Sequence, residues 1–179
     1  MRSRFIISIG FLFIIISTSC SNSQKEQRLT TSKDQQNNVD SNTAVATLSL
    51  PSFSVQDING NVVNLQNFKG KKLFVNLWAS WCPPCKREMP SIEKLYKSAD
   101  NNKVQFLLIS FDDQFEQAKK YVSSKGLKLP IYFPVESPPA LFNVQGIPAT
   151  FIFDEKGELI KRIDGSENYD TREYKTLFQ

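Results

Sequence analysis

The chain has 179 residues, of which 40% are hydrophobic and 12% aromatic, enough to form the core of one domain with appendages. Basic and acidic residues number 22 and 18, and no block of like charge follows the chain, which argues against a nucleic-acid-binding protein. There is no histidine, and the cysteines are Cys20, Cys82 and Cys85. These counts exclude His-dependent catalytic triads, Cys-His proteases and zinc sites of four thiolates.

The N-terminal segment predicts secretion. Arg2 and Arg4 precede an apolar run at residues 5–16, FIISIGFLFIII, and small residues follow. This pattern is typical of a secretory signal peptide. The run is shorter than the roughly 17–25 residues that span about 30 Å of hydrocarbon as a helix. A transmembrane anchor that also includes residues 17–19 stays an alternative.

Cys20 directly follows the small residues STS. This arrangement resembles a bacterial lipoprotein signal, although Ser17 stands where that pattern usually has an aliphatic residue. The resemblance implies cleavage of residues 1–19 and attachment of lipid to Cys20. The protein would then belong to the cell envelope, lipid-anchored to a bacterial membrane, with its domain facing the periplasm or the exterior. A free Cys20 after ordinary secretion is the alternative.

Residues 20–46 predict a tether. The segment is polar, with Leu29 and Val39 as the large apolar residues of its central part. It cannot bury enough apolar surface to offset the entropy of ordering, so we expect it to be disordered. A flexible coil of this length spans about 25–30 Å on average, enough to hold a domain off a membrane. A disordered leader without function fits the same residues.

Residues 47–179 have the pattern of a folded domain. Alternating apolar and polar residues around Asn59 and Gly60 predict a β-hairpin. Near-continuous apolar runs predict buried strands, and apolar residues three and four apart predict helices. In chain order, the expected elements are the hairpin at 53–65, a strand at 73–79, a helix at 87–99, a strand at 104–111, a helix at 112–126, a short strand at 129–135, a short helix at 137–144, a hairpin at 149–163 and a terminal helix within 170–179.

Capping residues predict where helices begin and end. Asp113 and Glu116 resemble a capping box at the start of the second helix, and Gly126 suits the position past its end. Ser137 is expected to cap the short helix, with Pro138 at its first position. Strand–helix–strand–helix followed by a hairpin indicates an α/β sandwich with a mixed central sheet.

Cys82 and Cys85 form a CxxC motif within the stretch ASWCPPCKREMP. Lys86 stands where a c-type haem motif needs histidine, so haem attachment is excluded. The two cysteines have no third or fourth soft partner for zinc. We expect no metal and no cofactor. A structural disulfide stays an alternative, although so small a loop changes the entropy of the unfolded chain little.

The position of the motif favours thiol–disulfide exchange. The pair follows a predicted buried strand and begins a helix, where backbone N–H groups and the helix dipole stabilise a thiolate at Cys82. Pro83 suits the first helical position. Cys85, one turn into the helix, is expected to be more shielded and to act as the resolving thiol.

The stretch FVNLWASWCPPCKREMP, residues 74–90, together with GIPATFIFDEKGEL, residues 146–159, resembles the TlpA/ResA-like branch of the thioredoxin family. The similarity covers roughly residues 50–165. It implies a thioredoxin fold, a mixed central sheet flanked by helices, to which the N-terminal β-hairpin is added. It also implies thiol–disulfide exchange by an extracytoplasmic domain attached to a membrane.

The resemblance assigns roles to individual residues. It makes Cys82 the attacking cysteine and Cys85 the resolving one, and it places Trp81 beside the site. Pro148, after Ile147, matches the family's cis-proline, which faces the cysteines and lets the preceding backbone pair with substrate. An ordinary trans proline before a strand is the alternative.

Two polar positions bear on proton transfer. Asn76 stands where many cytoplasmic thioredoxins have a buried aspartate beneath the cysteines. Glu88 matches an acidic residue of the ResA-like branch, and it shares a helix face with Cys85 three residues earlier. Glu88 could therefore assist proton transfer at the thiols. The alternative is a solvated Glu88 that pairs with Lys86 or Lys94.

The residues between the cysteines predict the redox direction. Both are prolines, which donate no N–H to a thiolate, so we expect a reducing dithiol and a protein-disulfide reductase. The family implies disulfide-bearing protein substrates, apocytochrome c among them, and a membrane thiol as electron donor. We expect a monomer.

Two other function classes stay open. A peroxiredoxin shares the fold, but that family has Thr or Ser three residues before its reactive cysteine and Pro seven before. Ala79 and Val75 occupy those positions relative to Cys82. A non-enzymatic, lipid-anchored binding or chaperone module, with the CxxC kept as a staple, is the other alternative.

Overall fold

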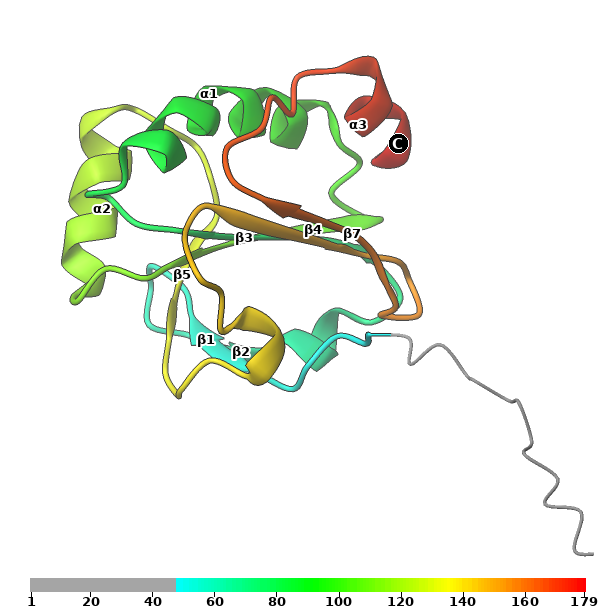
Figure 1. Cartoon of the computed structure of the whole chain (residues 1–179), viewed down its shortest axis with the longest axis horizontal. Coiled ribbons are helices and arrows are strands. Elements are labelled where there is room, and N and C mark those ends of the chain that lie inside the picture. The colour runs from blue at the N-terminus through cyan, green and yellow to red at the C-terminus, as the bar shows by residue number, and fades with distance from the viewer. Residues whose placement is uncertain (1–47) are drawn as a thin grey trace, which may run out of the picture. The chain divides into compact units, whose positions relative to one another are not determined.

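The computed structural model describes residues 48–179 (Figure 1). The predicted signal peptide, Cys20 and the tether lie outside the described residues. Within residues 48–179, every helix is too short or too polar to form a membrane span. The strands are β1 (Ser54–Gln56), β2 (Val62–Asn64), β3 (Lys72–Trp78), β4 (Val104–Ser110), β5 (Ile131–Pro134), β6 (Ala149–Phe153) and β7 (Leu159–Asp164). The helices are α1 (Pro83–Ser98), α2 (Phe115–Ser124) and α3 (Arg172–Leu177), with 3-10 turns η1 (Leu65–Phe68) and η2 (Ala140–Phe142).

The strands form one seven-stranded sheet in the order β2-β1-β5-β4-β3-β6-β7. β4 pairs in parallel with β3 and with β5, and the other neighbours are antiparallel. Helices α1, α2 and α3 pack on one face, and η1 and η2 pack on the other (Figure 1). The predicted architecture, a mixed sheet flanked by helices with an N-terminal hairpin, is confirmed.

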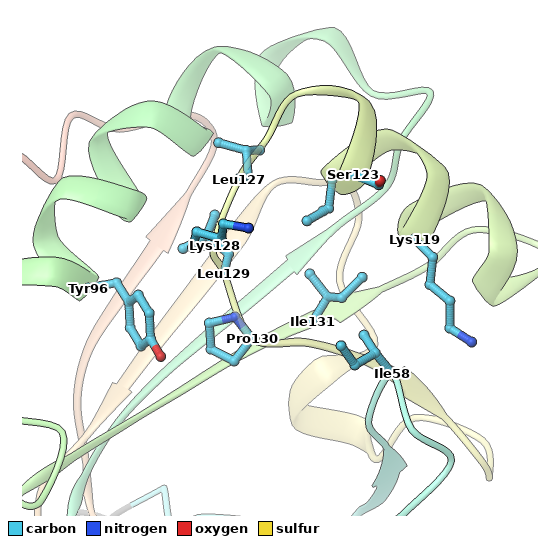
Figure 2. A pocket seen from close by; sticks show the side chains of 10 residues that line it. Ile58, Tyr96, Lys119, Ser123, Leu127, Lys128, Leu129, Pro130 and Ile131 are labelled. Carbon is cyan, nitrogen blue, oxygen red and sulfur yellow. The ribbon is translucent and has the colours of Figure 1, made fainter.

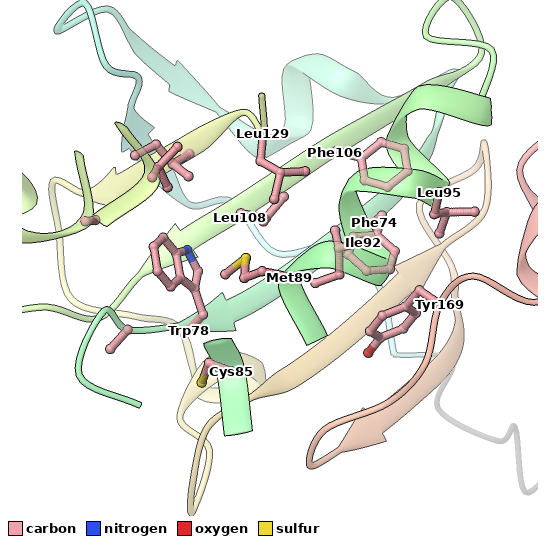
Figure 3. Packing of buried hydrophobic residues seen from close by; sticks show 14 of the residues in the cluster. Phe74, Trp78, Cys85, Met89, Ile92, Leu95, Phe106, Leu108, Leu129 and Tyr169 are labelled. Atoms are coloured by element: carbon pink, nitrogen blue, oxygen red, sulfur yellow. The ribbon is translucent and has the colours of Figure 1, made fainter. Parts of the chain in front are cut away.

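Successive side chains of a strand point to opposite sides of the sheet, and those of β3 are buried on both sides. Phe74 and Trp78 pack with the three α-helices, whereas Leu73, Val75 and Leu77 pack under the opposite layer. Figure 3 shows Phe74 and Trp78 in the first of these clusters. A strand buried on both sides therefore ends directly before the CxxC motif.

The predicted N-terminal hairpin is confirmed, with residues 57–61 in its loop. The Asp57 Oδ1 accepts hydrogen bonds from the N–H groups of Asn59 at 2.8 Å and Asn61 at 2.9 Å. Gly60 has a φ of 86°, a left-handed conformation that glycine adopts without steric cost. A side-chain acceptor and a glycine together close the loop.

Two predicted helix starts are wrong. α2 begins at Phe115 with Gln114 as its N-cap, not at a box of Asp113 and Glu116. Asp112, directly before that box, is held in the bend after β4, where its N–H donates to the Ser110 hydroxyl oxygen.

The helix expected from Ser137 and Pro138 is instead η2, with Pro139 as its N-cap. A residue that precedes a proline avoids the helical region, so Pro138 stays outside the turn. The predicted terminal helix within 170–179 is confirmed as α3.

Candidate redox site

The CxxC pair lies at the junction of β3 and α1. Cys82 is the N-cap of α1, and prolines occupy the first helical positions. The N–H groups of these positions have no partner within a helix, so proline loses no hydrogen bond there. Cys82 and Cys85 form a disulfide, with their Cα atoms 5.3 Å apart. The exposed fraction is 3% for Cys82 and 0% for Cys85. Cys85 is therefore the more shielded, by a small margin in this oxidised form.

One backbone donor faces the Cys82 sulfur. Its Sγ accepts a hydrogen bond from the N–H of Cys85 at 3.2 Å. Pro83 and Pro84 come between the two cysteines and have no N–H to offer. The helix start therefore supports a thiolate at Cys82 with fewer donors than a proline-free motif would supply.

The loop before β6 faces the disulfide. The peptide bond between Ile147 and Pro148 is cis, as the family resemblance implies. The Ile147 carbonyl oxygen lies 3.6 Å from the Cys82 Sγ. In the disulfide that sulfur carries no hydrogen, so this is a contact, which the thiol of the reduced enzyme can turn into a hydrogen bond. The Pro148 carbonyl oxygen accepts the N–H of Gly165 at 2.9 Å, which ties this loop to β7.

An apolar cleft of about 480 Å³ adjoins the redox pair. Trp81, directly before the attacking cysteine, is 60% exposed and lines the cleft together with Ile147. Phe111 and Phe142 are among its other lining residues. The structure thus brings Trp81, Ile147 and the cis-proline together around Cys82.

Glu88 is buried beneath this site, with 2% of its surface exposed. Its Oε1 accepts a hydrogen bond from the Asn76 Nδ2 at 2.9 Å, and its Oε2 accepts one from the Glu167 N–H at 3.1 Å. The alternative of a solvated Glu88 that pairs with Lys86 or Lys94 is wrong, because the carboxyl is enclosed and Lys94 forms an ion pair elsewhere. Burial raises the pKa of Glu88 to about 7, against the lowering effect of the two hydrogen bonds.

A chain of buried polar groups continues from Glu88 across the sheet. The Asn76 Nδ2 also donates to the Thr150 Oγ1 at 2.9 Å, and the Tyr169 hydroxyl donates to the same oxygen at 2.7 Å. Burial raises the pKa of Tyr169 above its usual range. The Asn76 Oδ1 has no hydrogen-bond partner among residues 48–179. These groups hold the Glu88 carboxyl in one orientation.

Thr150 and Tyr169 were not predicted as site residues. Thr150 is the one polar side chain in the apolar run of β6, ATFIF, and such a residue in a buried strand signals a hydrogen-bonded partner. Tyr169 lies in the irregular segment between β7 and α3. No periodic pattern covers that segment, so the sequence has no comparable signal for Tyr169.

A larger groove of about 660 Å³ lies between α1, α2 and the segment that leads into β5, and none of its lining residues adjoins either cysteine in the sequence (Figure 2). Its lining includes Tyr96 of α1, Lys119 of α2, Ile58 of the first hairpin loop and Pro130 directly before β5. This groove is larger than the cleft beside Trp81, but the disulfide, the buried carboxyl and the cis-proline all lie near that cleft. The chemistry of the chain is therefore concentrated at the start of α1.

A disulfide at the start of a helix, opposite a cis-proline on a mixed sheet of this order, defines a thiol–disulfide oxidoreductase with a thioredoxin-like fold. The chain belongs to the Redoxin family, whose model matches residues 46–177. The redox interpretation of Cys82 and Cys85 is confirmed by the relatives described next.

The chain is similar to several bacterial oxidoreductases. It is 29% identical over 126 residues to thiol-disulfide oxidoreductase ResA of Bacillus thuringiensis (strain Al Hakam). This match covers 69% of this chain and 72% of that protein. The identity is 33% with ResA of Geobacillus kaustophilus (strain HTA426), over the same shares. The solved thiol:disulfide interchange protein of Chlorobium tepidum TLS is 26% identical, with a TM-score of 0.60, and the match covers 74% of this chain and 96% of that one.

Proposed function

We propose that this oxidoreductase reduces protein disulfides outside the cytoplasm and is held at a bacterial membrane by lipid on Cys20. The observation that carries the redox part is the disulfide of Cys82 and Cys85 at the start of α1, against the Ile147 carbonyl. The basic and apolar N-terminus that precedes Cys20 supports the anchor. The family resemblance extends the proposal to apocytochrome c as a substrate and to a membrane thiol as electron donor.

The exchange takes two steps. In the reduced enzyme, the Cys82 thiolate attacks one sulfur of a substrate disulfide, which breaks that bond and releases a substrate thiolate. The Cys85 thiolate then attacks the Cys82 Sγ in the mixed disulfide. The second substrate sulfur leaves with the electron pair, and the enzyme is left in the disulfide form that the structure shows. The substrate gains two electrons, and the enzyme regains them from its thiol donor.

The second step requires Cys85 to lose its proton while it is buried. Glu88 lies one turn further along α1, on the same helix face. A carboxyl with a pKa of about 7 accepts and returns a proton readily near neutral pH. Glu88 is therefore the proposed proton acceptor for Cys85. If Glu88→Gln leaves the pH profile of thiol exchange unchanged, this role is lost.

The surroundings of Cys82 suit an extended polypeptide substrate. The Ile147 carbonyl lies against the Cys82 sulfur and is available to a substrate N–H once a substrate cysteine approaches. The cleft lined by Trp81 and Phe142 offers an apolar side chain of the substrate a place beside the exchanging sulfurs. We infer that Trp81, Ile147 and Pro148 bind substrate.

The redox direction follows from the donors at Cys82. Among residues 48–179, a single N–H, that of Cys85, donates to its sulfur, so the thiolate of the reduced form gains little stabilisation. The disulfide is then comparatively stable and the dithiol is reducing. A reduction potential as high as about −120 mV, the scale of strongly oxidising enzymes, would contradict the reductase role.

Insulin reduction by wild type and by Cys82→Ser tests the enzymatic part. We expect loss of turnover in the variant, and equal turnover would support the binding-module alternative. A peroxide turnover assay on the same pair tests the peroxiredoxin alternative, which predicts Cys82-dependent peroxide consumption.

In cells, Cys85→Ser should trap a mixed disulfide, and the protein captured in it identifies the substrate. Cys20→Ser should move the protein from the membrane fraction to the aqueous fraction, and an unchanged distribution would exclude the lipid anchor.

A further inference from the structure

A buried carboxylate, that of Asp112, lies where β3 and β4 end. Asp112 is 5% exposed. Its Oδ1 and Oδ2 accept the Ser80 N–H at 3.1 and 3.0 Å. The Ser80 hydroxyl donates to Oδ1 at 2.7 Å, and the Ser110 hydroxyl donates to Oδ2 at 2.7 Å. Both carboxylate oxygens therefore act only as acceptors, from three neutral donor groups.

Asp112 takes part in no ion pair within residues 48–179. The ion pairs of this part of the chain join other acidic residues to lysine or arginine. Buried carboxylates are normally paired or hydrogen-bonded, because an isolated buried charge is costly. Asp112 meets this requirement with hydroxyl and amide dipoles alone, which leave its formal negative charge in place.

The carboxylate is bonded into the turn that presents the attacking cysteine. The N–H of Cys82 donates to the Ala79 carbonyl at 3.1 Å, which closes a turn whose second residue is Ser80. The N–H of Phe111 donates to the Trp78 carbonyl at 2.7 Å, which ties the ends of the two strands together beside it. Ser80 is two residues from Cys82, so their Cα atoms are less than about 8 Å apart.

We propose that Asp112 is a positioning residue with a second effect: it fixes the turn from Ala79 to Cys82, and its buried charge keeps the Cys82–Cys85 couple reducing. The reduced enzyme carries negative charge as the Cys82 thiolate, whereas the disulfide is neutral. A nearby anion therefore destabilises the reduced form relative to the disulfide. This inference rests on the reducing direction proposed above and names a residue outside the CxxC motif that contributes to it.

We take the two charges to be on the order of 10 Å apart, because Asp112 contacts Ser80 and Ser80 lies two residues from Cys82. Two unit charges about 10 Å apart, in surroundings with an effective dielectric constant of about 20, interact strongly enough to change an equilibrium constant about tenfold. The interaction acts only on the ionised form of the Cys82 thiol, so tenfold is an upper limit. We therefore expect a change of about three- to tenfold when the charge of Asp112 is removed.

The measurement is the equilibrium in which the enzyme disulfide and two glutathione thiols give the enzyme dithiol and glutathione disulfide, at one pH, on the full chain. Asp112→Asn should shift it toward the dithiol by about three- to tenfold, or up to about 30 mV for this two-electron couple. The matched control is Ser110→Ala, which removes one hydrogen bond and keeps the charge. It should move the equilibrium less than twofold.

A shift of less than twofold in Asp112→Asn overturns the proposal, as does an equal shift in Ser110→Ala, which would assign the effect to hydrogen bonds. Asp112→Ser provides a second neutral variant, and thermal melting of the oxidised proteins tests their folding. If neither neutral variant folds, Asp112 serves stability and the redox part fails. A strongly oxidising wild type would instead contradict the reductase proposal, while the difference between wild type and Asp112→Asn could still be measured.

Discussion

Glu88 makes the stability of the oxidised protein depend on pH. Its carboxyl holds a proton up to about pH 7 in the folded chain, against an ordinary value of 4.5. Because the folded state binds this proton more tightly than the unfolded chain does, the contribution of Glu88 to the free energy of unfolding is greatest at low pH and falls as the pH rises toward 7. At 1.36 kcal/mol for each pKa unit, the whole effect amounts to about 3 kcal/mol, and most of it falls between pH 5 and pH 8.

Four other carboxyls of residues 48–179 have pKa values that are shifted the opposite way. The chain has no histidine. Hydrogen bonds hold the pKa values of Asp57, Glu93, Asp100 and Asp170 below their ordinary values. The stabilisation that these four contribute is therefore lost only at more acidic pH, as the pH falls through their folded-state pKa values.

The test is urea unfolding of oxidised wild type and Glu88→Gln at several pH values from 5 to 8. Glutamine fills nearly the same space and does not titrate. The stability of wild type relative to this variant should therefore fall by about 2–3 kcal/mol across the range. Glu93→Gln, on the same helix, is the matched control and should show a constant offset. If the stability difference between wild type and Glu88→Gln stays constant within about 0.5 kcal/mol, the buried carboxyl is ionised throughout, and the reasoning is wrong.

Three further substitutions test the core, a turn and the substrate cleft. Phe74→Ala should lower the free energy of unfolding by about 3–5 kcal/mol, because its ring centroid lies 5.0 Å from those of both Phe106 and Tyr169; urea unfolding measures this. Gly157→Ala should cost at least about 1 kcal/mol in the same assay, since its φ is 84° and an added Cβ would lie 3.3 Å from a neighbouring side chain. Trp81→Ala should change stability by less than about 0.5 kcal/mol yet lower kcat/KM for insulin reduction, and an unchanged kcat/KM would remove Trp81 from the substrate site.

Local sequence patterns predicted the elements that position the site. The apolar runs at β3 and β4 identify buried strands because each has a packed layer on both sides, so neither face needs polar residues. The helix that follows Cys82 was predictable from its prolines and apolar spacing. The start of α2 was missed because the Asp112 carboxylate accepts hydrogen bonds from Ser110 and Ser80. These contacts hold residue 112 outside the helix, which begins at Phe115.

The burial of Glu88 could not be read from the local sequence. The two residues before it, Lys86 and Arg87, are charged, and a charged run of this kind in a helix fits a solvated residue equally well. The backbone of Glu167, which reaches the carboxyl, is 79 residues away along the chain. The contact between Ser80 and Asp112 spans 32 residues and exists because β3 and β4 run parallel and end at the same edge of the sheet.

The order of the strands also bears on aggregation. The outermost strands of a sheet expose unpaired backbone groups that can template pairing with another chain. Here one outermost strand, β2, has only three residues. The other, β7, alternates exposure along its length and carries Lys161 and Arg162. Short length and charge are two of the devices by which natural sheets discourage edge-to-edge association. The strand order that keeps β3 in the interior of the sheet therefore places a short strand and a charged strand at the two edges.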